Sequence, residues 1–280
     1  MIAAILKRAG QNRSLQTILV GVIAAAMIAG LCFSQDTSAR SSDSTQLVAN
    51  LRSNDPHTRV GAFEQIRSNA QMVQDPKVQS ALFDLLDLET HEGNDRVREG
   101  ERRRAEHEEG NPESSDDDAM YMNDLLETVE SFVKWHDPHE ICLLAKAGAG
   151  LDSPDERESA VRAQVALPCL QQLSKSNLFM DRLKAVGTSV ALLARAKSSL
   201  DSTTVEAMRQ MVILALHDQR VEVKWEAVDS LERGGRSDMI PALKELAESS
   251  PGPDATKDDI AVRRNAAKAI SAIQQREGQK

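Results

Sequence analysis

The sequence predicts an all-α protein made of stacked helical hairpins that follow one membrane-crossing segment. Three observations support this prediction. Hydrophobic residues make up 41% of the 280-residue chain but aromatic residues only 3%, which is too few to fill the pleated surfaces of a β-sandwich or barrel. Residues 14–35 contain no charged residue, and a pattern of helix length recurs between residues 55 and 270 at nearly constant spacing. The abundance of Ala, Leu, Glu, Arg and Gln also favours helices.

Residues 1–39 are predicted to be a signal peptide or a transmembrane anchor. Lys7, Arg8 and Arg13 precede the uncharged stretch 14–35, and a helix of that length spans a hydrocarbon core of about 30 Å. Because the bases lie before this stretch, we expect the N-terminus in the cytoplasm and the C-terminal domain across the cytoplasmic membrane. Two alternatives stay open: a retained single-pass anchor that contacts the membrane, or cleavage near residues 37–39 to give a periplasmic or secreted protein.

Residues 40–280 are predicted to form one acidic helical repeat domain. The chain has 34 Lys plus Arg and 43 Asp plus Glu, of which residues 1–39 hold three bases and one acid, so the domain has a net charge of −11. Nucleic-acid binding needs a basic face, and we therefore expect no nucleic-acid partner. Cys142 and Cys169 could pair in an oxidising compartment. Both stand in apolar runs, however, which favours small buried hydrophobic side chains over a disulfide.

The repeated pattern marks one helix of each hairpin. It consists of an anchor residue, a base directly after it, a small residue at +4 and an aliphatic residue at +8, as in Val223, Lys224, Ala227 and Leu231. Positions i, i+4 and i+8 share one helix face, and the small residue lets a partner helix approach closely. Steps of 39, 44, 42, 40 and 39 residues indicate about six stacked hairpins; the anchors are Thr58, Val97, Ile141, Leu183, Val223 and Val262.

The other helix of each hairpin is expected between the anchors. Asp followed by Pro, as in Asp55–Pro56 and Asp137–Pro138, supplies an N-cap and a first-turn residue for the anchor helix. The apolar runs between the anchor helices predict their partners at residues 47–51, 78–88, 122–133, 160–173, 205–216 and 240–247.

Over residues 43–276 this pattern resembles the HEAT-repeat family, including the bacterial HEAT-like repeats of the phycobilisome-lyase type. The resemblance rests on Asp–Pro with an anchor–base pair and on the small and aliphatic positions after it. It implies a right-handed α-solenoid (an armadillo-like superhelix) whose second helices line a concave face. It also implies that acids and bases at family positions tie adjacent repeats together; here these are Asp55, Arg59, Asp181, Lys184, Asp218, Lys224 and Arg263. The chain departs from the pattern at Glu101 and at Cys142, which stands in place of a base.

A charged segment, residues 93–118, interrupts the array. It contains bases followed by acids and almost no apolar residue, so it cannot bury a helix face. We expect a charged helix held by Glu–Arg pairs that runs into a disordered loop. A partner-docking insertion is the alternative, because insertions in repeat proteins lie on loops of one face.

No motif in the sequence indicates catalysis. The densest set of metal-ligand residue types is at positions 135–140, where His136 and His139 are weak zinc candidates, but no third ligand is evident and the turn already explains Asp137. The sequence has no Gly-x-Ser-x-Gly, no phosphate-binding Gly loop and no Cys-x-x-Cys. We therefore expect no enzyme activity, no cofactor and no bound metal.

Trp225 is the strongest candidate for partner binding. At about 100° per residue it points away from the predicted buried stripe of its helix, and Val60 and Arg264 take the same position in the first and last repeats. Tryptophan and arginine are frequent in binding hot spots; contact with a neighbouring repeat is the alternative. The sequence thus favours a non-enzymatic scaffold or adaptor that binds a protein, with basic partners preferred by an acidic surface. The rival functions are a lyase-like or metal-binding accessory enzyme and a self-associating structural protein of the cell envelope.

Overall fold

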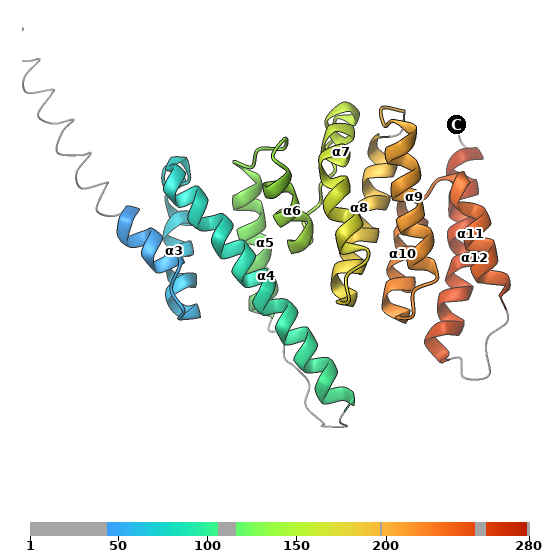
Figure 1. Ribbon diagram of the computed structural model, residues 1–280, viewed down its shortest axis with the longest axis horizontal. Helices are drawn as coiled ribbons and strands as arrows, with labels where there is room; N and C mark the ends of the chain where they lie inside the picture. The colour runs from blue at the N-terminus through green and yellow to red at the C-terminus, as the bar shows by residue number, and fades with distance from the viewer. Residues whose placement is uncertain (1–43, 106–115, 197, 250–255, 279–280) are drawn as a thin grey trace, which may run out of the picture. The chain divides into compact units, whose positions relative to one another are not determined.

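A computed structural model describes residues 44–105, 116–196, 198–249 and 256–278 (Figure 1). Within these ranges every regular element is a helix and none is a strand, which confirms the all-α prediction. None of the helices in these ranges is both long and apolar enough to cross a membrane. The predicted membrane-crossing segment, residues 14–35, lies outside the described residues, as does the predicted boundary at residue 39.

The chain divides into two compact units, residues 1–81 and residues 82–280. The described part of the first unit contains a helix at residues 44–51, then α3 (Pro56–Ser68), the short 3-10 helix η1 (Met72–Gln74) and the start of α4 (Pro76–Ala105). Leu51, Phe63 and Ile66 are fully buried in this unit. Ala62 and Ile66 therefore take the inward positions that the repeat pattern predicts for α3.

Helix α4 contradicts the predicted second hairpin. The expected helix at 78–88 and the expected anchor helix around Val97 are parts of one continuous helix that runs to Ala105. Ion pairs between residues three positions apart follow the expected turn, with 2.9 Å between Arg98 and Asp95 and 2.7 Å between Arg102 and Glu99. No proline interrupts this stretch, and Glu and Arg are good helix formers. The first part of the charged segment is thus helical as expected; residues 106–115 lie outside the described residues.

The second unit arranges its later helices in two rows (Figure 1). The even-numbered helices contact one another in the order α6, α8, α10 and α12, and the odd-numbered helices in the order α7, α9 and α11. Consecutive helices form the hairpins α7–α8, α9–α10 and α11–α12. Beyond α4 the elements are α5 (Asp116–Glu130), α6 (Pro138–Ala147), α7 (Glu156–Leu173), α8 (Phe179–Ala196), α9 (Ser202–Leu216), α10 (Val221–Gly234), η2 (Ser237–Met239), α11 (Ile240–Glu248) and α12 (Lys257–Gly278).

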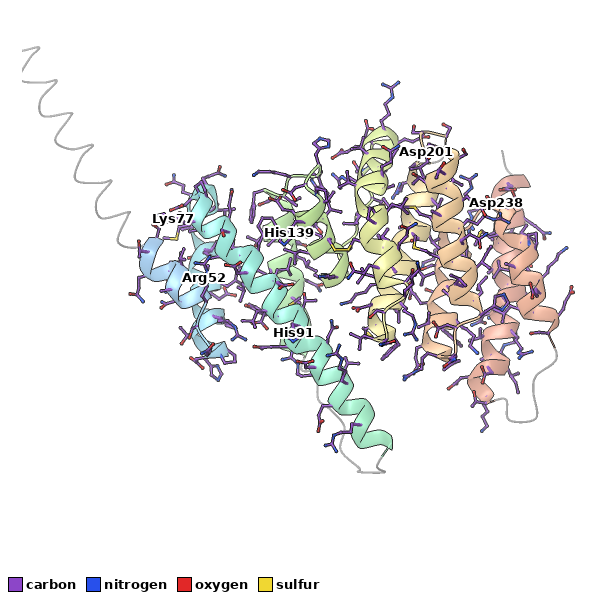
Figure 2. The ribbon with its side chains drawn as sticks, in the orientation of Figure 1. Arg52, Lys77, His91, His139, Asp201 and Asp238 are labelled. Carbon is purple, nitrogen blue, oxygen red and sulfur yellow. A yellow bond between two sulfur atoms is a disulfide. The ribbon has the colours of Figure 1, made fainter. Side chains whose placement is uncertain are left out.

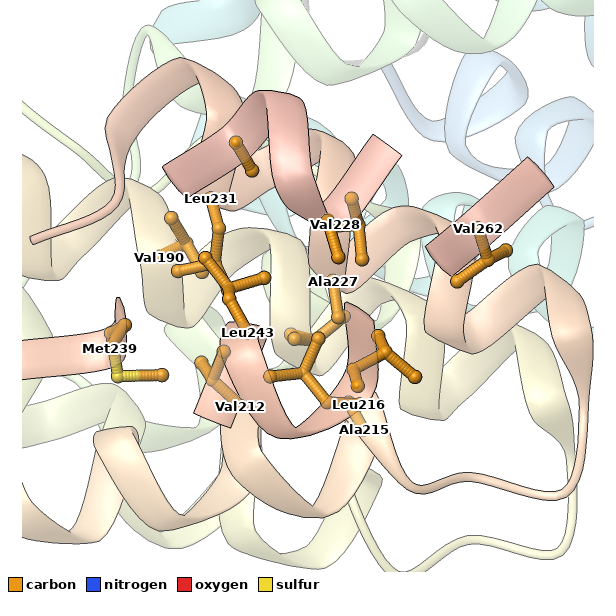
Figure 3. Packing of buried hydrophobic residues seen from close by; sticks show 14 of the residues in the cluster. Val190, Val212, Ala215, Leu216, Ala227, Val228, Leu231, Met239, Leu243 and Val262 are labelled. Atoms are coloured by element: carbon orange, nitrogen blue, oxygen red, sulfur yellow. The ribbon is translucent and has the colours of Figure 1, made fainter. Parts of the chain in front are cut away.

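Aliphatic residues from both rows form the core of this unit (Figure 3). In α10 the predicted stripe of Val223, Ala227 and Leu231 is buried, with at most 1% of each residue exposed. Helices α9 and α12 add Val212, Leu216, Val262 and Ala266 to the same cluster. Burial of these side chains is the main source of stability for a helix pair whose isolated helices would be marginal in water.

The predicted register of α8 is wrong by two residues. The pattern placed Leu183, Gly187 and Ala191 toward the core, but all three are only partly buried. Ala185 and Ser189 are fully buried instead. Small residues occur on both faces of this helix, so the sequence period alone could not distinguish them, and packing against α7, α9 and α10 selects the buried face.

Candidate functional site: ties between hairpins and the exposed Trp225

Two Asp–Pro turns form the N-terminal caps that the sequence predicts. The Asp55 carboxylate accepts a hydrogen bond from Thr58 N at 3.0 Å and a second from the Thr58 hydroxyl, and these bonds lower the pKa of Asp55. Asp137 accepts from His139 N at 2.9 Å and from Glu140 N at 3.3 Å. Asp55, which the family resemblance assigned to repeat stacking, therefore caps its own helix.

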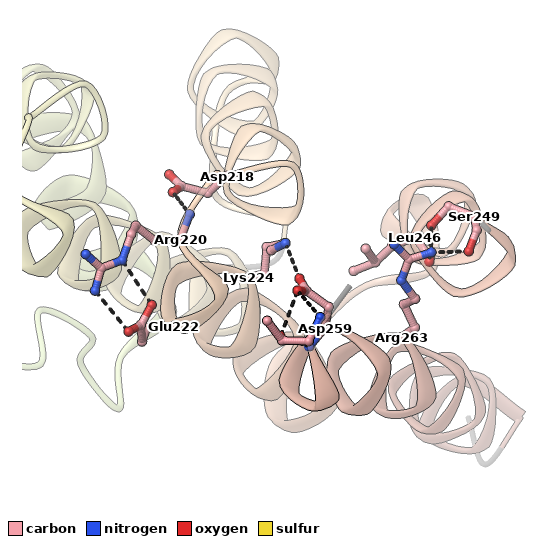
Figure 4. A network of polar contacts seen from close by, with 9 residues as sticks. Asp218, Arg220, Glu222, Lys224, Leu246, Ser249, Asp259 and Arg263 are labelled. Carbon is pink, nitrogen blue, oxygen red and sulfur yellow. Dashed lines mark hydrogen bonds and ion pairs between the residues drawn. The ribbon is translucent and has the colours of Figure 1, made fainter. Parts of the chain in front are cut away.

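The predicted bases after the anchors reach two kinds of acceptor. Arg59 and Arg263 bind the loop of their own hairpin: Arg59 Nη1 donates to Ser53 O at 3.1 Å, and Arg263 donates to the hydroxyl and carbonyl oxygens of Ser249 (Figure 4). Two lysines reach a neighbouring hairpin instead. The base directly after the anchor therefore binds either its own hairpin or a neighbouring hairpin. The sequence pattern did not distinguish these two cases.

Lys184 and Lys224 are the bases that tie adjacent hairpins. Lys184 Nζ of α8 donates to Lys146 O near the C-terminal end of α6, and burial lowers the pKa of Lys184. Lys224 Nζ of α10 lies 2.8 Å from Asp259 Oδ1 of α12 (Figure 4). That hydrogen bond, together with those from Thr256, lowers the pKa of Asp259 to about 2.

Asp218 forms a third tie, with a partner that the sequence reasoning missed. Arg182 of α8 donates to both Asp218 oxygens, at 2.7 and 3.0 Å, and the two side chains are only 18% and 12% exposed. Burial raises the pKa of Asp218, but the hydrogen bonds from Arg182 and from the backbone of Arg220 outweigh it and the pKa is lowered. The predicted Asp181 accepts locally, from the Ser176 hydroxyl at 2.7 Å. Arg182 stands one residue before the anchor, where the pattern has no fixed residue type.

Cys142 takes the place of the missing base and is covalently bonded. Its sulfur joins that of Cys169, with the two Cα atoms 5.5 Å apart. Cys142 lies in α6 and Cys169 in α7, so the bond connects one predicted hairpin to the next. The interpretation of these cysteines as small buried hydrophobic residues is therefore wrong. Their apolar neighbours favoured burial, and no pattern in the sequence brings positions 27 residues apart into contact.

The proposed histidine cluster is part of a structural turn. His136 and His139 are exposed (Figure 2 labels His139), Asp137 caps α6, and the Glu140 carboxylate accepts from Lys134 N at 2.6 Å. Within the described ranges no three His, Cys, Asp or Glu residues are grouped so that they could hold a metal ion. The carboxylates near these histidines are thus occupied by the backbone.

Trp225 is exposed as the helical period predicts. It is 41% exposed on α10, and Val60 on α3 is 38% exposed. Arg264 is exposed on α12, which packs against α10. Trp225 and Arg264 therefore lie on neighbouring helices of the even-numbered row, whereas Val60 belongs to the first unit.

Two hollows lie beside α10. One, of about 280 Å³, lies between α8 and α10 over Gly187 and Ala191, and its charged residues pair with one another, as in Arg195 with Asp152 at 3.1 Å. The other, of about 610 Å³, lies beyond Gly234 and Gly235. Neither lining contains a histidine or a cysteine. No protein-family model matches the sequence, and no curated protein is significantly similar to it.

Proposed function

We propose that the chain is a non-enzymatic scaffold or adaptor built of HEAT-like hairpins in a right-handed solenoid, and that it binds a protein through the outer face of its even-numbered helices. The observation that carries the proposal is the exposed Trp225 on a helix held on both sides by ties to its neighbours. Arg182 binds Asp218 just before α10, and Lys224 binds Asp259 of α12. Tryptophan is one of the residues most often found in the hot spots of protein–protein interfaces.

The arrangement of the ties supports a rigid surface. Successive even-numbered helices are linked at three places, from α6 to α8, from α8 to the turn before α10, and from α10 to α12. In repeat proteins each unit contacts its neighbours, and the stacked helices form an extended face that is suited to another macromolecule. Such an extended face supports a scaffold as the proposed function.

The proposed location is outside the cytoplasm, with the domain anchored by residues 14–35 or released after cleavage. The bases before that segment favour export of the residues that come after it. The Cys142–Cys169 disulfide supports the same location, because disulfides persist in oxidising compartments and are rare in the cytosol.

Affinity capture from detergent-solubilised membranes tests the proposal. Wild-type chain is expected to retain one or more proteins at stoichiometric yield, and Trp225→Ala is expected to lose them. Leu214→Ala removes a side chain that is 61% exposed on the odd-numbered helix α9, so it is the matched control and should retain the same proteins. Equal recovery by wild type and Trp225→Ala would show that Trp225 is not the hot spot, and capture of no protein would refute the scaffold.

Two further measurements address the rival functions. Stoichiometric zinc in the purified chain that is lost in His136→Ala/His139→Ala would replace the scaffold by a metal-binding function. Light scattering of the purified chain tests the self-associating envelope protein, and a strictly monomeric chain would exclude it.

A further inference from the structure

One junction between neighbouring hairpins is covalent where others are polar. The base after the anchor forms a polar tie in a later repeat, as Lys224 does with Asp259. Cys142 occupies the same position in α6, and its disulfide to Cys169 of α7 takes the place of the polar tie (Figure 2). A polar tie breaks and re-forms by thermal motion, whereas a disulfide opens by exchange with a thiol. The α6–α7 junction therefore depends on redox conditions in a way that a polar tie does not.

The two sulfur-bearing residues differ in their access to solvent. Cys169 is only 8% exposed, whereas Cys142 is partly exposed. A thiolate breaks a disulfide by attacking one sulfur and expelling the other as a thiolate. We therefore expect a dithiol to attack the sulfur of Cys142 and to expel that of Cys169. The second thiol of the reagent then displaces Cys142, so that two protein thiols and one oxidised dithiol result and two electrons pass to the protein.

The chain around α6 gives this helix room to move once the bond is open. Gly148 ends α6 in the left-handed region, at φ 90°, and residues 148–155 lie outside any helix before α7 begins. An extended segment of this kind lets α6 separate from α7 without unfolding either helix. The buried side chains of Ile141 and Leu144 still hold α6 in place. Reduction should therefore make α6 open more often and leave the chain folded.

We propose that the Cys142–Cys169 disulfide is a redox-controlled tie of the folded protein. A dithiol reductant opens it and loosens α6 against α7, and a disulfide oxidant closes it again. The proposal goes beyond the proposed function and does not depend on Trp225. It gives the repeat array one junction whose stiffness follows the thiol–disulfide balance of its surroundings.

Reduction of the native chain tests the redox-controlled tie. The full-length Cys32→Ala chain, in a nonionic detergent, has Cys142 and Cys169 as its only cysteines. It is treated with dithiothreitol at several urea concentrations below the unfolding transition, and the free thiols are counted by alkylation and mass spectrometry. We expect a reduction rate that does not depend on urea, because the reagent reaches the bond in the folded chain. A rate that rises with urea in proportion to the unfolded fraction, or no reduction of the native chain, would overturn the proposal.

Hydrogen exchange followed by mass spectrometry locates the effect of reduction. Amides of α6 should exchange at least about tenfold faster in the reduced chain than in the oxidised chain, whereas those of α12 should change by less than about twofold. Equal acceleration in α6 and α12 would mean that the bond only stabilises the whole unit. That result, or unchanged exchange in α6, would overturn the redox-controlled tie.

Variants and re-oxidation provide the controls. Cys142→Ala/Cys169→Ala should show the fast exchange of α6 and no response to dithiothreitol, with circular dichroism to confirm that it is folded. Asp259→Asn removes the polar tie between α10 and α12, and its α6 should stay slow until dithiothreitol is added. Oxidised glutathione should restore slow exchange of α6 in the reduced chain, and failure to do so would refute a reversible tie. These outcomes are distinct from failure of the scaffold, which is decided by protein capture.

Discussion

Removing the Cys142–Cys169 disulfide is expected to destabilise the second unit more than any loss of a polar tie. Cys142→Ala/Cys169→Ala deletes the bond and puts no polar group at the partly buried position 142 or the buried position 169. The bond closes a loop between residues 27 positions apart. Without it the unfolded chain regains the freedom that the loop had restricted, and the folded state loses relative stability.

The size of the effect depends on the loop length. In the chain-entropy treatment a loop of this length restricts the unfolded state by about 12 cal/mol/K, or about 3.5 kcal/mol at 25 °C. That free energy corresponds to a change of a few hundredfold in the unfolding equilibrium. For a unit of this size the melting temperature should fall by about 7–14 °C.

Urea unfolding with a local probe measures this change. In a Trp225→Phe background Trp135 is the only tryptophan, and it contacts Arg162 on α7, the helix that carries Cys169. Its emission therefore reports on the cross-linked region. We expect the double variant to unfold at lower urea with little change in the m-value, and wild type treated with a reductant should behave like the variant.

The third cysteine supplies the control. Cys32→Ala should unfold like wild type and stay sensitive to the reductant, whereas the double variant should be insensitive to it. The reasoning is refuted if the double variant and untreated wild type share one midpoint, or if reduction leaves the wild-type midpoint unchanged.

Three smaller predictions concern single residues of the ties and turns. The hydrogen bond from Lys224 lowers the pKa of Asp259 to about 2 from an ordinary value of 3.8. A carboxyl whose pKa is lower in the folded state stabilises the protein above about pH 4, and this stabilisation is lost as the pH falls toward 2. Between pH 4 and pH 2 the melting temperature of Asp259→Asn should therefore fall less than that of wild type. Gly148→Ala places a side chain at φ +90° with no contact closer than 3.7 Å, and it should lower the free energy of unfolding by about 1–2 kcal/mol in chemical denaturation. Gly61→Ala, in open space inside α3, should raise the free energy of unfolding by about 0.5–1 kcal/mol. Equal effects of the two substitutions would contradict both predictions. Arg182→Met removes a bidentate partner from the largely buried Asp218 carboxylate and should lower the free energy of unfolding by about 2–3 kcal/mol, measured by thermal unfolding. An unchanged melting temperature would contradict this prediction.

The sequence predicted the parts of the fold that depend on neighbouring residues. Helices α6 and α10 lie where the anchors Ile141 and Val223 place them, and the Asp137–Pro138 cap begins α6 as expected. An N-cap and an i, i+4, i+8 stripe involve residues within two or three helical turns, so their energetics are visible in a short window of sequence.

Tertiary packing determined what the sequence did not reveal. The anchor at Val97 lies inside α4, because a turn there would need a residue that breaks the helix and Asn94 does not do so in this context. Helix α8 has small residues on two faces, and its neighbours decide which face is buried. The exposure of Trp225 could be predicted from the helical period, but the pairing of Arg182 with Asp218 joins residues 36 positions apart and left no local signal.

The covalent link between α6 and α7 also has a mechanical consequence. If the chain is pulled from its two ends, polar ties such as Lys224 with Asp259 can break and re-form, but the disulfide cannot yield to a force that only unfolds helices. The 27-residue separation between the two cysteines would extend by about 90 Å as free chain. While the disulfide is intact, the chain between the two cysteines cannot extend when the molecule is pulled. Reduction of the disulfide should therefore lengthen the fully stretched molecule by a fixed amount.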